Sequence, residues 1–91
     1  MNDSKIVIAV LQRGWVYVGR LTMVPDMPGW LRLKGANCIR SWGTTNGLGQ
    51  LRKGPTAITK LDPAGTVDFH ELTAVNLIRD LEEAAWAKHC D

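Results

Sequence analysis

The residues best suited to chemistry stand close together between Arg40 and Gln50. This stretch reads Arg-Ser-Trp-Gly-Thr-Thr-Asn-Gly-Leu-Gly-Gln, so three glycines are interspersed with a cation, an aromatic ring, hydroxyls and amides. Glycine lets the backbone come close to a ligand, while arginine and tryptophan supply a charge and a stacking face. Backbone N–H groups at a helix start near Gly47 would add donors for an anion. The stretch predicts a binding loop for a nucleotide or an oligonucleotide, with the site residues Arg40, Trp42, Thr44, Thr45, Asn46 and Arg52.

The same loop has a purely structural interpretation. In that case Trp42 anchors the core, and Thr45 or Asn46 caps the helix that follows. Two known nucleotide-binding motifs are absent. Pro55 stands where a Gly-x-x-x-x-Gly-Lys phosphate loop needs its lysine, and Arg52 takes the place of the third glycine of a dinucleotide fingerprint.

No catalytic or metal-binding pattern accompanies this loop. His70 and Glu71 come closest to an acid–base pair, but neighbouring side chains on a strand point to opposite faces. The soft metal ligands are His70, His89, Cys38 and Cys90, with neither a Cys-x-x-Cys nor a His-Glu-x-x-His spacing. We therefore expect a protein that is not an enzyme and uses no metal or cofactor, with His70 at the surface or at a sheet edge.

Four tryptophans are many for a chain of 91 residues. Two of them are expected in the core. Trp30 follows a loop rich in proline and glycine, and Trp86 stands in an alanine-rich helix, where a large aromatic side chain is typical of a docking anchor. The alternative is that both are buried. Trp30, Trp86 and nearby basic residues form the predicted contact surface for a host protein or for a second copy of the chain.

Length and charge narrow the function further. A chain of this size with 45% hydrophobic and 22% charged residues predicts one domain over residues 1–91. The net charge is only +2, but residues 1–60 hold nine lysines and arginines against two acids, and residues 61–91 hold two against seven. This split allows intramolecular pairing, head-to-tail assembly or a basic face. The modest total charge disfavours extended nucleic acid as a partner.

The composition also predicts where the protein works. The longest apolar run, residues 6–11, is too short to cross a bilayer, and no secretory leader is recognisable. Cys38 and Cys90 are too few for a disulfide framework, so we expect reduced thiols and a cytoplasmic protein with no membrane partner.

Alternating apolar residues and turn residues predict an α+β fold. The expected strands are residues 5–11, 15–23, 30–42 with a bend at Gly35, 56–61 and 66–78. The expected connections are turns at 12–14, 25–29 and 62–65, the last a type I turn built on Asp-Pro-Ala-Gly. They give a small curled antiparallel sheet of about five strands, for which an SH3-like curl is one arrangement, with a sheet core over residues 5–78.

Two helices complete the predicted fold. A short one at 47–53 stands between strands three and four and ends at Gly54 and Pro55, with Leu48 and Leu51 facing inward. A C-terminal helix covers 80–89, with Asp80 as N-cap and Glu83 in the capping-box position. The stretch 73–78 is ambiguous, since it also fits one helix from Thr73 onward.

Several strings of this sequence resemble a family of small uncharacterised proteins encoded by phages and prophages. The strings are Leu33–Asn37, Arg40–Trp42, Gly47–Leu51, Gly54–Thr56, Leu61–Val67 and His70–Leu72. The resemblance covers about residues 5–78. It implies a phage setting, in which small proteins often bind and modulate a host component, defence systems included. It leads to the hypothesis of a non-enzymatic binding module that sequesters or inhibits a host factor in the host cytosol, and the alternative is nucleotide capture by the loop from Arg40 to Gln50.

Overall fold

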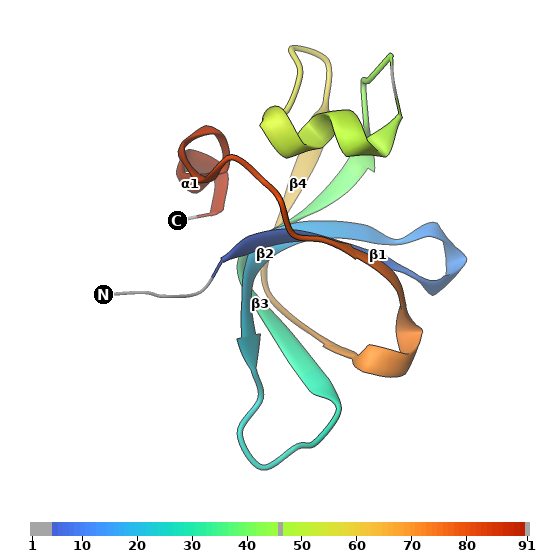
Figure 1. The fold of residues 1–91 in the computed structure, drawn as a ribbon, viewed down its shortest axis with the longest axis vertical. Coiled ribbons are helices and arrows are strands. Elements are labelled where there is room, and N and C mark those ends of the chain that lie inside the picture. The colour runs from blue at the N-terminus through green and yellow to red at the C-terminus, as the bar shows by residue number, and fades with distance from the viewer. Residues whose placement is uncertain (1–4, 46, 91) are drawn as a thin grey trace.

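The computed structural model describes residues 5–45 and 47–90, which form a five-stranded antiparallel sheet with a C-terminal helix (Figure 1). The strands are β1 (Ile6–Leu11), β2 (Val16–Met23), β3 (Trp30–Ser41), β4 (Lys60–His70) and β5 (Ala74–Ile78), and the helix is α1 (Glu83–Cys90). Three 3-10 segments join them: η1 (Gln12–Gly14), η2 (Leu48–Lys53) and η3 (Glu71–Thr73). The strand order is β4-β3-β2-β1-β5. The predicted fold class is confirmed, although the described sheet stays open, with β4 and β5 as its edges, and is not closed into a barrel.

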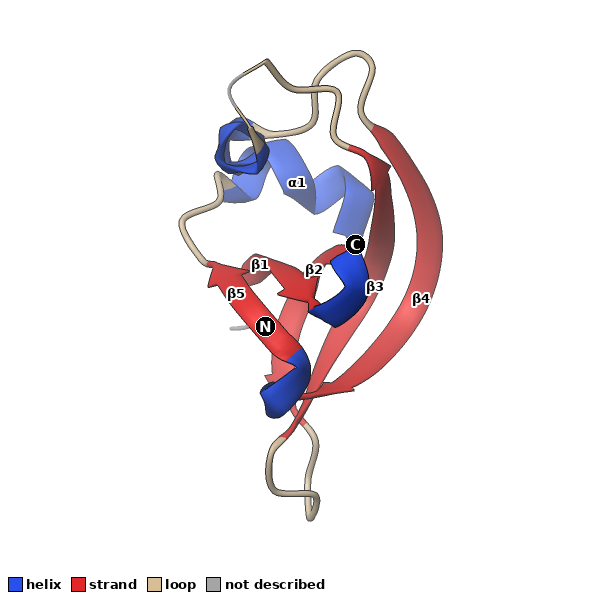
Figure 2. Cartoon of the chain, turned by 90° about the vertical axis from the view of Figure 1, so that its right-hand side faces the viewer, coloured by secondary structure: helices blue, strands red, loops and turns tan. Residues whose placement is uncertain are grey.

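Both faces of the sheet are buried, each in a core of its own. On one face Ile8, Val18 and Ile39 pack with Leu51 of η2 and Trp86 of α1. On the other face the curl of the sheet covers a second cluster, which contains Val7, Ala9, Leu33, Ala36 and Phe69. Figure 2 shows α1 on one side of the sheet and the long, curved strands β3 and β4. Burial on both faces explains why residues 6–9 form an unbroken apolar run.

The type I turn predicted at residues 62–65 is wrong, because β4 runs straight through it. Pro63 is tolerated there because β4 is an edge strand, where a missing N–H need not break a ladder on the open side. Gly35 and Gly65 have φ of 59° and 71°, and the β3–β4 register shifts on both sides of Ala36. The turn residues therefore produce bulges that bend the strand pair, and residues 60–70 form one strand.

The predicted strand 66–78 is interrupted by η3, which carries the chain from β4 to the far edge of the sheet. The Nδ1 atom of His70 accepts a hydrogen bond from the Leu72 N–H (3.1 Å), and the Thr73 hydroxyl donates to the His70 carbonyl (2.7 Å). Beyond this turn β5 pairs with β1. Residues 74–78 are thus strand, so the alternative of one helix from Thr73 onward is wrong.

The C-terminal helix begins at Glu83, three residues later than predicted, so Asp80 is not its N-cap. The Glu82 N–H donates to the Arg52 carbonyl of η2 (2.7 Å), which commits the chain just before the helix to a tertiary contact. At the other end of α1, the Asn37 side-chain amide donates to the His89 carbonyl (2.7 Å). Among the described residues, no helix is long and apolar enough to cross a membrane.

Trp86 is fully buried, so the prediction of an exposed docking anchor is wrong. Its indole Nε1–H donates to the Leu51 carbonyl (2.8 Å), which ties α1 to η2. The alanines around it reflect close packing, since a Cβ added at Gly54 would lie 2.9 Å from the Cβ of Ala85. An alanine-rich helix is thus compatible with a buried aromatic anchor as well as with an exposed one.

Three ion pairs connect the basic first part of the sequence with its acidic last part. They join Arg20 to Glu83, Arg32 to Asp68, and Arg40 to Asp62. Each pair links a base of the first 60 residues to an acid of the last 31. The split therefore serves, at least in part, intramolecular pairing.

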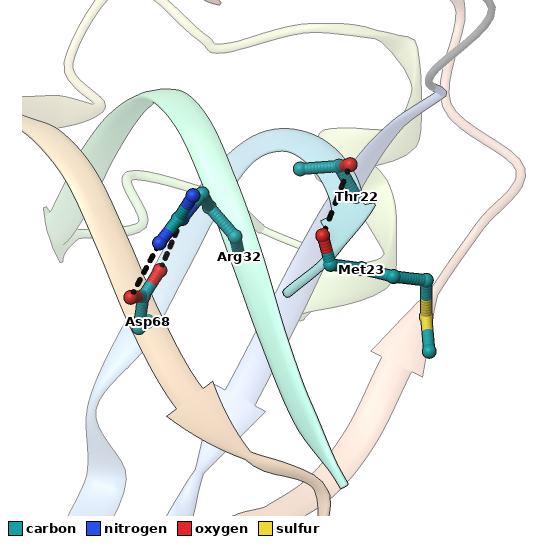
Figure 3. A network of polar contacts seen from close by, with 4 residues as sticks. All are labelled: Thr22, Met23, Arg32 and Asp68. Carbon is teal, nitrogen blue, oxygen red and sulfur yellow. Dashed lines mark hydrogen bonds and ion pairs between the residues drawn. The ribbon is translucent and has the colours of Figure 1, made fainter. Parts of the chain in front are cut away.

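The Arg32–Asp68 pair makes a testable prediction about pH (Figure 3). Two hydrogen bonds from Arg32, at 2.8 and 3.1 Å, hold the pKa of the Asp68 carboxyl below its ordinary value. The pair should stabilise the fold fully above the unfolded pKa of about 4, and this contribution should vanish as pH falls through the lowered folded pKa. NMR titration of the Asp68 carboxyl carbon should show the lowered midpoint, and Arg32→Gln should raise it. An unchanged midpoint in Arg32→Gln would contradict the pairing.

Candidate functional site

The structure does not gather the predicted loop residues into one site. Arg52 lines a shallow pocket of about 320 Å³ with Gly49, Gln50 and Lys53. Arg40 lines a different pocket. Asn46 lies outside the described residues, and Thr44 is half-buried. The predicted nucleotide loop is therefore split between two surfaces.

Several polar groups of the loop form hydrogen bonds within the loop or with residues just before β4. The backbone N–H and the hydroxyl of Thr45 both donate to the Gln50 side-chain oxygen, at 3.0 and 3.3 Å. The Thr59 hydroxyl donates to the Trp42 carbonyl (2.6 Å), which ties the loop to the start of β4. Thr45 is not the N-cap of η2, because Gly47 takes that position without a side-chain cap. These bonds give the loop a structural role.

The tryptophans are distributed differently from the prediction of two in the core. Trp86 is buried and Trp30 half-buried, whereas Trp15 and Trp42 are 55% and 42% exposed. The structural interpretation of Trp42 as a core anchor is therefore wrong. Trp15 was not among the predicted site residues, although its alternation with Tyr17 on one strand face was a signal that could have singled it out.

Arg40 belongs to a pocket beside the β1–β2 hairpin, which we call the Trp15 pocket. Its volume is about 240 Å³, and it is lined by Gly14, Trp15, Val16, Cys38, Ile39, Arg40 and Asp62. Arg40 Nε lies 3.0 Å from Asp62 Oδ2, and both side chains are at least half exposed. Burial, followed by the nearby Asp62 charge, raises the pKa of the Cys38 thiol, which therefore stays neutral. The pocket lining thus combines an aromatic side chain, a neutral thiol and an ion pair.

A second surface lies where the loop between β2 and β3, at the bottom of Figure 1, is joined to η3 by a backbone hydrogen bond. We call it the apolar end and define it by Met23, Met27, Trp30 and Leu72. Met23, Met27 and Leu72 are 66%, 47% and 78% exposed. Figure 3 shows the Met23 side chain extending away from the Arg32–Asp68 pair.

Two contacts hold the apolar end in place. The Glu71 N–H donates to the Gly29 carbonyl (2.7 Å), so the loop and η3 are joined directly. The Trp30 ring meets the His70 ring edge-on, with centroids 5.5 Å apart. His70 lies on edge strand β4, as predicted, and its Nδ1 is used by the Leu72 N–H. Apolar side chains on a tethered loop form a surface suited to binding.

The described residues contain no group of three or more His, Cys, Asp or Glu side chains placed to hold a metal ion. Comparison of the sequence with protein-family models and with curated proteins found no match to either.

Proposed function

We propose that this protein is a non-enzymatic, phage-encoded binding module that sequesters or inhibits a host factor, and that it contacts its partner through the apolar end. The observation that carries the proposal is the exposure of Met23, Met27 and Leu72 on segments that the Glu71–Gly29 hydrogen bond joins. Isolated apolar side chains are common on protein surfaces, but clustered ones mark interaction sites.

The chemistry of this surface suits a protein partner. Methionine side chains are flexible and polarizable, so they adapt to an apolar surface of irregular shape. Trp30, held against His70, supplies a large aromatic side chain of the kind that dominates binding energy at interfaces. Trp30 thus remains part of the proposed contact surface. Trp86 does not belong to it, and Met23, Met27 and Leu72 take part instead.

The phage setting rests on the sequence resemblance, and a cytosolic location in the host follows from it. Cys38 and Cys90 are not joined by a disulfide, which suits a reducing compartment. The partner is a host protein, with a second copy of this chain as the competing occupant.

The test compares two charged variants of the apolar end with a matched control. Leu72→Glu and Met27→Glu place a charge where a partner would bury the side chain, and should reduce capture of a host protein from bacterial lysate at least tenfold. Ile58→Glu is the control, because Ile58 is 68% exposed at the other end of the molecule. It should capture the same protein as the wild type.

Light scattering on the same four proteins measures self-association. Dimers lost only in Leu72→Glu and Met27→Glu would assign the apolar end to a second copy. Monomers that capture nothing, or capture that is equally strong in Leu72→Glu and in Ile58→Glu, would contradict the proposal.

A further inference from the structure

We propose that the Trp15 pocket binds the base of a nucleoside monophosphate. This site is separate from the apolar end and does not depend on the function proposed above. It rests on three groups that the fold brings together from the residue before β2, from β3 and from β4: the Trp15 ring, the Arg40 guanidinium and the Asp62 carboxylate.

Trp15 supplies the stacking face. Its side chain is 55% exposed although it lies next to the ordered sheet, and its ring is almost parallel to that of Tyr17, at 15° with centroids 6.4 Å apart. The Leu11 N–H donates to the Trp15 carbonyl (2.7 Å), which fixes the backbone that carries the ring. A flat aromatic ring on a fixed backbone binds nucleobases because every base has a π-face.

Arg40 and Asp62 supply the polar edge. A guanidinium donates and a carboxylate accepts, and the two stand 3.0 Å apart, so they match the edge of a base that presents an acceptor beside a donor. The β3–β4 register shifts between Ile39 and Ser41, where Arg40 stands. Such irregularities redirect a side chain, here toward a strand face that carries the pocket.

The remaining surroundings suit an anionic group on the ligand. Asp62 is the one acidic residue among the pocket residues, and Cys38 stays neutral. Arg13 is exposed, precedes Gly14 of the pocket wall, and holds a left-handed φ of 67° that is unfavourable for a residue other than glycine. An exposed cation next in sequence to a pocket residue is available to pair with a phosphate.

The experiment is a titration of the ¹⁵N-labelled full chain with AMP and GMP, followed through the Trp indole and Arg Nε signals. Both nucleotides should shift the signals of Trp15 and Arg40. Trp15→Ala should weaken AMP binding about tenfold, since stacking of a base contributes roughly one order of magnitude in affinity. Trp42→Ala is the matched control, because Trp42 is 42% exposed but does not line the pocket, and it should bind as the wild type does.

Each of the other arms gives a decisive result. Ribose 5-phosphate and inorganic phosphate should produce much smaller shifts than AMP, and oligoadenylates should bind no tighter per strand than AMP. Equal response to phosphate alone, affinity that grows with strand length, or shifts confined to Gly49–Lys53 and abolished by Arg52→Ala would overturn the proposal. The absence of any shift at millimolar nucleotide would also overturn it. Leu72→Glu should leave AMP binding unchanged, so failure at the apolar end and failure here are distinguishable.

Discussion

Replacing Trp86 with alanine is expected to lower the free energy of unfolding by about 3–5 kcal/mol, a large share of the roughly 5–15 kcal/mol that holds a typical domain together. Trp86 is 0% exposed and fills the space between α1, η2 and the sheet, where it packs with Ile8, Val18 and Leu51. The truncation would leave a large cavity in one of the two cores. It would also deprive the Leu51 carbonyl of the indole N–H that it now accepts from.

Urea denaturation followed by circular dichroism measures this loss. Trp86→Phe separates packing from hydrogen bonding, because it keeps a ring in the core and removes the donor, so a loss of about 1–3 kcal/mol is expected. Trp42→Ala serves as the control for an exposed tryptophan and should cost less than about 1 kcal/mol. If Trp86→Ala cost no more than Trp42→Ala, α1 would not be part of the folded core.

Gly35→Ala is expected to displace the C-terminal end of α1 and to cost about 3 kcal/mol, the sum of a left-handed backbone penalty and a steric one. Gly35 has φ 59°, and a Cβ built on it would overlap the carbonyl oxygen of Cys90. Neither β3 nor the last turn of α1 can easily move away, because Asn37 holds the neighbouring His89 carbonyl. The new Cβ at position 35 and the Cys90 carbonyl would therefore have to move apart.

Gly65→Ala provides the matched control on the paired strand. Gly65 has a similar φ of 71°, but nothing lies within 4 Å of a Cβ at that position, so the expected cost is only about 1 kcal/mol. Hydrogen exchange should show faster exchange of the α1 amides in Gly35→Ala and little change in Gly65→Ala. Equal behaviour of the two variants would mean that the contact between β3 and α1 does not hold the helix.

The sequence predicts the structure best at positions where the residue type has one main local effect, such as ending a helix or forming a loop. Gly54 ends η2, and the loop at 25–29 stands where two prolines and a glycine exclude regular structure. Leu48 and Leu51 pack inward as predicted. These features depend on neighbours in the sequence, which is why they could be predicted without a structure.

The predictions are wrong where contacts with distant parts of the chain determine the conformation or the burial of a residue. Asp-Pro-Ala-Gly at 62–65 is a turn sequence by local preference, yet it lies within β4 because an edge strand tolerates Pro63 and a bulge. The alanine-rich sequence around Trp86 fits a buried helix as well as an exposed one, so it does not predict the burial of the side chain. Whether the helix packs against η2 is settled by residues 35 positions away, through the bond to Leu51.

The candidate sites were the least predictable part. The sequence predicts a role for Arg40, but the other pocket residues Trp15 and Asp62 lie just before β2 and on β4, and their approach depends on the β2–β3 and β3–β4 registers. The apolar end combines the loop after β2 with the turn after β4, joined through Gly29 and Glu71. No spacing along the chain shows that meeting.

The most direct test of the proposed function is site-specific photo-crosslinking in host cells. A benzophenone amino acid at position 72 should form a covalent adduct with one host protein, while the same residue at position 58, which is also well exposed (68% against 78%) but lies at the other end, should form none. Adducts at both positions, or at position 58 alone, would contradict the claim that this protein acts by holding a partner at its apolar end.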